Sequence, residues 1–295
     1  MQSVETPPWV VVGIDGSEAA VGAALWGIDE AVARDIPLRL VYAIDPRESI
    51  HRDADSFAHR LATAEIAVRY AMMAVEASEQ AVKIEIEIVH EQSVAALTRA
   101  SRSAVLLCVG ASRHSSVKRV GSTAAALSAS AQCPVALLRG NDKVVRGDGG
   151  WIGVVSDRSG QNGVLVKRAL EEAMLRHAQV RVLNPAQGVD VKKAGVAAAE
   201  RDNDICDSVD PRLADRTGRD PELGLRSVPL CGSIADYLNE HSQSIKLFVV
   251  CADSLGQPDS AGESVLYDTD CPLLILRGDS HLDHDRAAIA EHQRL

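Results

Sequence analysis

The sequence repeats itself, and this repeat constrains the fold more than any other feature. Residues 133–140 (CPVALLRG) recur as 271–278 (CPLLILRG), and 10–17 (VVVGIDGS) are echoed by 152–159 (IGVVSDRS). The apolar runs AVLLCVG and KLFVVCA also occupy equivalent places in the two halves. The matching blocks occur in the same order, 138 to 142 residues apart. A chain of 295 residues with such a repeat is predicted to form two domains of one fold.

Within each half, segments typical of strands alternate with segments typical of helices. Apolar runs predict buried strands, and the alternation of Ile with Lys and Glu near residue 85 predicts a strand with one wet face. In the first half the predicted strands are 9–14, 37–44, 83–89, 105–109 and 134–138, and the predicted helices are 18–34, 56–80, 93–101 and 121–131. This order predicts the α/β class: two tandem doubly wound domains, each a five-stranded parallel sheet with helices on both faces.

The repeat also sets the expected domain organisation. We expect a first domain over 1–140, a polar, Gly-rich linker over 141–149, a second domain over 150–278 and a polar tail over 279–295. The stretch from about 186 to 226 is charged and shows no regular periodicity, so no continuous helix is predicted there.

Composition excludes several classes of protein. The formal net charge of −10 repels nucleic-acid phosphates and anionic lipids, and the apolar runs are far shorter than the roughly 18 to 20 residues of a membrane span. The N-terminus has no basic segment before its apolar run, as a signal peptide would. The six cysteines form no C-x-x-C pair, so buried reduced thiols and a cytoplasmic location are expected. His281 and His284 are expected to lie in a solvated tail, not in a metal site.

Two loops are candidates for binding a ligand, because doubly wound sheets bind ligands beyond the carboxyl ends of their strands. One is Gly13 to Ser17, after the first strand, and the other runs from Gly110 to Thr123, after the central strand. Gly121, Ser122 and Thr123 open a predicted helix, whose free N–H groups favour a phosphate, and Arg113, His114, Lys118 and Arg119 make the loop basic. The alternative for Ser122 and Thr123 is simple N-capping.

Asp15 has two compatible interpretations. Its carboxylate could accept a hydrogen bond from a ribose or base, or help to hold Mg²⁺, while Asp-Gly-Ser could equally form a turn in which Ser17 caps the next helix. The sequence contains no G-x-x-x-x-G-K-[ST] motif, no G-x-G-x-x-G after the first strand, and no recognisable nucleophile with its base. We therefore expect no enzyme, or at most very weak ATP hydrolysis.

These blocks together resemble the universal stress protein family in its tandem two-domain form. The resemblance rests on VVVGIDGS, on the Gly-led loop into Gly121-Ser122, and on CPVALLR. It implies binding of ATP, with or without Mg²⁺, or of a related adenine nucleotide by the first domain. The residues that it implies for the site are Gly13, Asp15, Ala43, Gly110, Ala111, Ser112, Arg113, His114, Gly121, Ser122 and Thr123.

The sequence departs from the family's nucleotide loop, G-x-x-G followed by nine residues and G-[ST]. The interval from Gly110 to Gly121 is two residues short, and Arg113 stands where the second Gly belongs. In the second half Ala252 replaces the first Gly and Asp259 the last, so that half is expected to bind no nucleotide.

Two functions remain open. One is an ATP-binding regulator of stress or dormancy, in which the nucleotide sets conformation or the choice of partner. The other is a nucleotide-free scaffold of the same fold. The resemblance also implies that the last strands, 135–138 and 273–276, pair between domains, and that two chains form a homodimer with unidentified protein partners.

Overall fold

A computed structural model of the chain describes residues 8–47, 54–111, 122–139, 150–155, 162–185, 224–230, 233–252, 269 and 271–277. The described residues divide into two compact units, one within 8–139 and the other within 150–277. The expected linker lies outside the described residues, so the domain boundaries stay a prediction.

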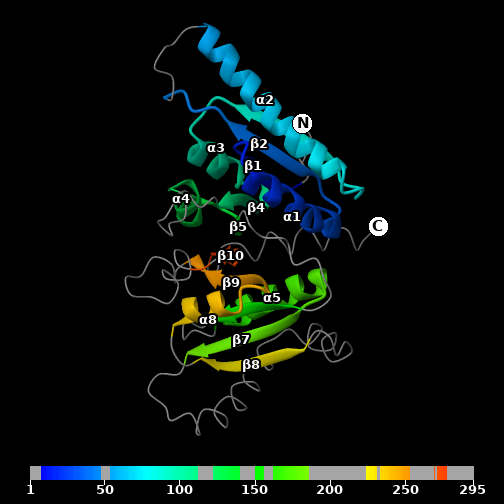
Figure 1. The fold of residues 1–295 in the computed structure, drawn as a ribbon, viewed down its shortest axis with the longest axis vertical. Coiled ribbons are helices and arrows are strands. Elements are labelled where there is room, and N and C mark those ends of the chain that lie inside the picture. The colour runs from blue at the N-terminus through cyan, green and yellow to red at the C-terminus, as the bar shows by residue number, and fades with distance from the viewer. Residues whose placement is uncertain are drawn as a thin grey trace, which may run out of the picture. The chain divides into compact units, whose positions relative to one another are not determined.

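In the first unit, strands and helices alternate as the sequence predicts (Figure 1). The elements are β1 (Trp9–Ile14), α1 (Glu18–Arg34), β2 (Leu38–Ala43), α2 (Ala54–Glu76), β3 (Ile84–Val89), α3 (Ser93–Ala100), β4 (Ala104–Ala111), α4 (Ser122–Ser130) and β5 (Val135–Arg139). The strands pair in parallel in the order β3-β2-β1-β4-β5. The predicted α/β class and parallel sheet are confirmed.

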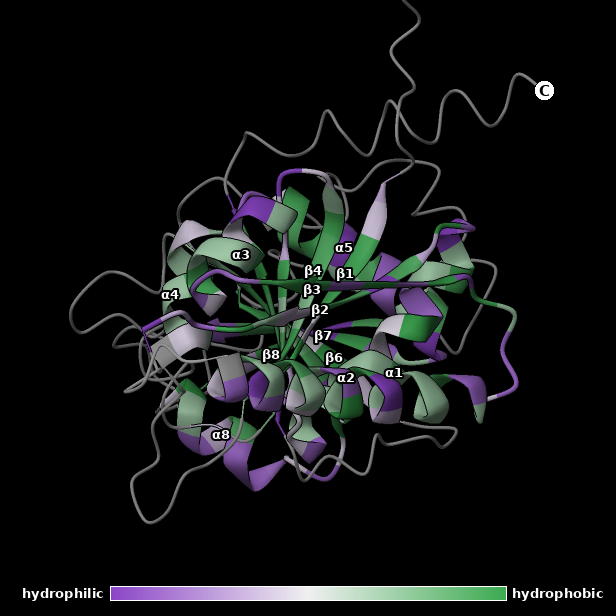
Figure 2. Ribbon diagram, turned by 90° about the horizontal axis from the view of Figure 1, so that it is seen from above, coloured by the Kyte–Doolittle hydropathy of each residue, from purple (hydrophilic) through white to green (hydrophobic). Residues whose placement is uncertain are grey.

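Helices cover both faces of this sheet. Figure 2 shows α1 and α2 on one side of the strands and α3 and α4 on the other, with the strands coloured as hydrophobic. The central strands are buried from both sides, and Val10, Val12, Leu106 and Leu107 are fully inaccessible to solvent. Strands covered on both faces need continuous apolar runs, which is why β1 and β4 lack the polar alternation of β3.

Local signals set the bounds of α1. The Ser17 hydroxyl accepts a hydrogen bond from the Ala20 N–H at 3.1 Å, which satisfies one of the free donors of the first turn. At the other end, Asp35 takes a left-handed conformation with φ 52°, and its N–H donates to the carbonyls of the last turn. These caps place the helix at the predicted 18–34.

Two elements differ from their predicted bounds by two residues or more. The helix predicted to reach residue 80 ends at Glu76, because the chain turns away and Glu79 adopts a positive φ of 57°. The central strand is longer than the predicted 105–109, because its ladder with β5 continues to Ala111, which lies opposite Arg139.

The second unit repeats the strand order of the first. Its elements are β6 (Trp151–Val155), α5 (Asn162–Arg176), β7 (Gln179–Pro185), β8 (Leu225–Leu230), α8 (Ile234–Glu240), β9 (Ile245–Cys251) and β10 (Leu273–Leu276). The strands are parallel in the order β8-β7-β6-β9-β10. The start of β8 falls inside the stretch expected to be irregular, and residues 186–223 lie outside the described ranges. Pairing between the last strands of the two units stays a prediction.

The repeat extends to buried side chains. Glu30 in α1 is fully buried and pairs with Arg34 at 2.6 Å, and Glu172 in α5 pairs with Arg176 at 3.1 Å with 1% of its side chain exposed. Each acid lies four residues before its arginine, and the two pairs are 142 residues apart.

Among the described residues, no helix is both long and apolar enough to traverse a lipid bilayer.

Candidate functional site

The candidate site lies beyond the carboxyl ends of β1, β2 and β4. These strands are parallel neighbours, with Gly13 opposite both Val41 and Val109 in the ladders. From β1 the chain goes through α1 to β2 on one side, whereas β4 and β5 lie on the other side. The strand order therefore reverses between β1 and β4, which is where doubly wound sheets leave a crevice for a ligand.

The turn after β1 holds Asp15 at this edge. One carboxylate oxygen, Oδ1, accepts the Ser17 N–H at 2.9 Å, while Ser17 caps α1 and Gly16 takes a φ of 85° that favours glycine. The structural interpretation of Asp-Gly-Ser is thus confirmed. Asp15 is exposed, and its other oxygen makes no hydrogen bond within the described ranges. The turn therefore leaves one acceptor free for a ligand.

Gly13 lies in a packed environment. A Cβ added to it would lie 3.0 Å from Cδ1 of Leu97 in α3 and 3.3 Å from Cγ1 of Val109. The space above this glycine is therefore filled by the protein's own side chains, so a ligand near Gly13 would reach it from the open end of the strand.

Gly110 allows a close approach of the chain to itself. A Cβ at this position would lie 2.4 Å from the carbonyl carbon of Ala19 and 2.5 Å from the nitrogen of Ala20. No side chain fits there, because the obstructing atoms are the backbone of the first turn of α1. Packing alone thus requires a glycine at 110, whatever the loop beyond it binds.

The remaining candidates divide between described and undescribed positions. Ala43 ends β2 and is half-buried, Ala111 ends β4 and is buried, and Thr123 lies half-buried in the first turn of α4, which begins at Ser122. The helix start thus falls at the predicted Ser-Thr pair. Ser112, Arg113, His114 and Gly121 lie outside the described residues, and the site that they complete stays a prediction.

Four cysteines lie in the described ranges, all buried and none in a disulfide bond: Cys108, Cys133, Cys251 and Cys271. This confirms the expectation of reduced thiols at those positions. Burial raises the pKa of the Cys133 thiol to about 12. Because only a thiolate attacks efficiently, Cys133 is a packing residue and not a nucleophile at neutral pH.

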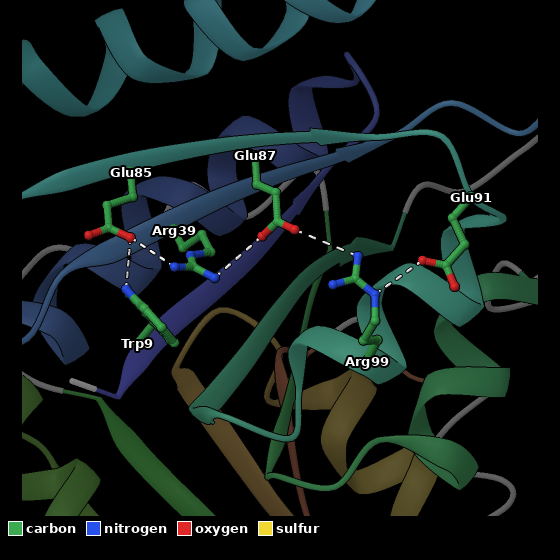
Figure 3. A network of polar contacts seen from close by, with 6 residues as sticks. All are labelled: Trp9, Arg39, Glu85, Glu87, Glu91 and Arg99. Atoms are coloured by element: carbon green, nitrogen blue, oxygen red, sulfur yellow. Dashed lines mark hydrogen bonds and ion pairs between the residues drawn. The ribbon is translucent and has the colours of Figure 1, made fainter. Parts of the chain in front are cut away.

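A polar network on the α3 side of the sheet was not anticipated from the sequence (Figure 3). Glu85 of β3 accepts hydrogen bonds from Nε1 of Trp9 at 2.9 Å and from Nη2 of Arg39 at 3.0 Å. The Arg39 guanidinium also lies over the Trp9 ring, 3.5 Å from its centroid. The second unit has the same stacking of Arg181 on Trp151, at 4.6 Å.

The network continues towards α3. Glu87 lies between two arginines, 3.4 Å from Nη1 of Arg39 and 3.6 Å from Nη2 of Arg99, and Arg99 donates from Nε to Glu91 at 3.3 Å (Figure 3). Every carboxylate in the network has an arginine partner. The network therefore holds β3 against the rest of the unit and leaves none of its carboxylates without an ion pair. The 142-residue spacing of the two Trp-Arg pairs was the signal that could have revealed it.

Glu85 gives this network a testable pH dependence. Hydrogen bonds from Arg39 and Lys83 hold the pKa of Glu85 below its usual value. Such a carboxyl stabilises the folded state above the unfolded pKa of about 4.3, and this contribution is lost as the pH falls through the lower folded pKa. Glu85→Gln should therefore lower the free energy of unfolding by up to about 1 kcal/mol at pH 7 and by less near pH 3. Urea unfolding followed by Trp fluorescence measures both, and Glu65→Gln is the control. A deficit that stays constant from pH 7 to pH 3 would refute the argument.

Comparison with known proteins decides the family. The sequence profile described as "Universal stress protein family" matches residues 9–139. Universal stress protein Rv2028c of Mycobacterium tuberculosis is 42% identical over 285 residues, which cover 94% of this chain and 98% of that protein. The chain belongs to the universal stress protein family. The resemblance expected from its motifs is confirmed.

A solved structure of a universal stress protein shares this fold. The crystal structure of one from Archaeoglobus fulgidus has a TM-score of 0.68 with 15% sequence identity, and the match covers 92% of this chain and 98% of that one. A universal stress protein in complex with cAMP matches 46% of this chain and 98% of its own, at 24% identity and a TM-score of 0.34.

Proposed function

We propose that the first unit binds an adenine nucleotide, ATP with or without Mg²⁺, beyond the carboxyl ends of β1, β2 and β4. One observation carries the proposal: β1 and β4 are parallel neighbours between which the strand order reverses. The chain's membership of the universal stress protein family also supports the proposal, because the resemblance to that family implies nucleotide binding.

Different residues would contact different parts of the nucleotide. Gly13 and the free oxygen of Asp15 would lie against the adenosine, and the backbone at Ala43 against the base. Ala111, Ser112, Arg113 and His114, following Gly110, would hold the ribose and phosphates, and Gly121, Ser122 and Thr123 would supply the phosphate end, where the start of α4 provides free N–H groups.

In this proposal the protein is a regulator and not an enzyme. The nucleotide would set its conformation or its choice of protein partner during stress or dormancy, in the cytoplasm and as a homodimer. The second unit would bind no nucleotide, because Ala252 and Asp259 replace the two glycines and a carboxylate at the phosphate end repels the ligand. The alternative is a nucleotide-free scaffold, which the substitution of Arg113 for the middle glycine favours.

Nucleotide that copurifies with the full chain tests the proposal. Heating the purified protein should release material that absorbs at 260 nm and elutes as an adenine nucleotide. Gly121→Glu should abolish it, because the added carboxylate would occupy the phosphate position, whereas Gly22→Glu, on an open face of α1, should leave it unchanged. Equal nucleotide content in wild type and Gly121→Glu would show that the site lies elsewhere. If no nucleotide is found in the wild type or in either variant, before or after incubation with Mg-ATP, the scaffold is favoured.

A further inference from the structure

Helix α2 is apolar on two opposite faces. Its inner face packs on the sheet through Ala64, Val68 and Val75, all buried. On the opposite face Ile66, Tyr70 and Met73 are 70%, 60% and 58% exposed. Because they lie four and three residues apart, they line one side of the helix. The small side chains of Ala62 in α2 and of Ala77, in the turn directly after it, extend the line. We call these five residues the outer stripe.

The outer stripe concentrates the apolar exposure of the described residues. It holds three of their six exposed large hydrophobic side chains, and the other three, Val32, Phe57 and Ile86, lie on separate elements or another face. Scattered apolar residues on a surface are ordinary, whereas a continuous line of them on one helix face marks an interaction surface. Within the first unit, α2 runs along the outside of the sheet, and no described element of that unit covers its outer side (Figure 1).

Charges beside the stripe indicate which partner fits it. Arg69 and Glu76 are two turns apart on the same flank of the stripe, and neither makes an ion pair within the described part of the chain. If two such helices pack antiparallel, the arginine of each comes beside the glutamate of the other. The flank is therefore complementary to the same flank of a second copy. An unrelated partner that is only acidic or only basic would match one of these two charges and not the other.

We propose that α2 is a self-association surface, on which the α2 helix of a second copy of this chain packs antiparallel. With the two-fold axis beside residue 72, Tyr70 meets Met73 of the second copy, and Arg69 meets Glu76 of the second copy on both sides of the axis. The open edge of β3 is a poorer route, because a β3–β3 pair would bring Glu85 and Glu87 against their own copies. The proposal does not depend on nucleotide binding.

Sedimentation velocity of the full chain, over a series of concentrations up to about 200 µM, tests the proposal. A single helix pair buries less than a standard interface, so dissociation constants of about 1 to 100 µM are expected for this step. Met73→Glu should raise the dissociation constant more than about tenfold, because it places two charges in the apolar contact. Val32→Glu, which adds the same charge to an exposed apolar position of α1, is the matched control and should leave it unchanged.

Charge reversal separates self-pairing from binding of another partner. Arg69→Glu alone and Glu76→Arg alone should each raise the dissociation constant about fivefold, since each converts two attractions into two repulsions. The double variant should return it to within about twofold of wild type. All these side chains are exposed, and circular dichroism checks that the fold is kept.

Three outcomes would overturn the proposal. The first is a wild-type chain that shows no association step up to 200 µM. The second is an association step that Met73→Glu leaves unchanged. The third is a loss of association in both single reversals that the double variant does not restore, which would assign the outer stripe to a different partner protein or a different packing.

Discussion

Replacing Gly110 with alanine is expected to lower the free energy of unfolding by about 3 kcal/mol. The new methyl group would lie 2.4 to 2.7 Å from backbone atoms of Ala19 and Ala20, well inside the contact distance of real side chains. The end of β4 and the first turn of α1 would have to move apart. Because Ser17 caps that same turn, the displacement would also disturb the loop that carries Asp15. Urea unfolding measures the loss of stability.

Gly22→Ala is the matched control. Gly22 lies inside α1, and a Cβ added there meets no atom within 4 Å. Alanine is the better helix former, so this substitution should stabilise the protein by about 0.5 to 1 kcal/mol. The two variants add the same methyl group near one helix and should shift the unfolding midpoint in opposite directions. A Gly110→Ala protein as stable as wild type would contradict the close approach of β4 to α1.

Removing the buried carboxylate of α5 should strongly destabilise the second unit. Glu172 is 1% exposed and lies 2.7 Å from Nη2 of Arg168 and 3.1 Å from Nη1 of Arg176, both of which are 8% exposed. Glu172→Ala leaves two largely buried guanidinium groups without this counter-charge, which typically costs about 3 to 5 kcal/mol. Urea or thermal unfolding of the full chain gives the measurement.

The adjacent residue provides the control for this prediction. Glu171 also forms ion pairs on α5, at 3.8 Å from Nη1 of Arg168 and 3.9 Å from Nζ of Lys167, but its side chain is 36% exposed. Water screens such pairs, so Glu171→Ala should change stability by less than about 1 kcal/mol. Equal losses in the two variants would show that burial does not set the strength of these pairs.

The sequence predicted the fold well because the relevant signals are local or repeated. Ser17 before α1 and Asp35 after it are caps that can be read within a few residues, and the predicted helix matched the observed one. The parallel sheet with helices on both faces followed from the alternation of strands with helices. The bounds of α2 and β4 were missed, because a backbone turn at Glu79 and a ladder partner for Ala111 depend on tertiary context.

The contacts that the sequence did not reveal are those between distant residues. Trp9 donates to Glu85 across 76 positions, and no pattern within one segment indicates that pair. The requirement for glycine at 110 arises from the backbone of Ala19, on a different element. A glycine that the family resemblance assigns to the nucleotide loop therefore also has a packing role. For that reason, a loss of binding in Gly110→Ala would not by itself locate the ligand.

Calorimetric titration of the full chain with Mg-ATP, after bound nucleotide has been removed, tests the central claim most directly. One nucleotide per chain is predicted, with binding lost in Gly121→Glu and retained in Asp259→Asn, because only the first unit keeps a glycine at the phosphate end of its loop. Absence of heat at millimolar Mg-ATP, or binding of two nucleotides per chain, would contradict it.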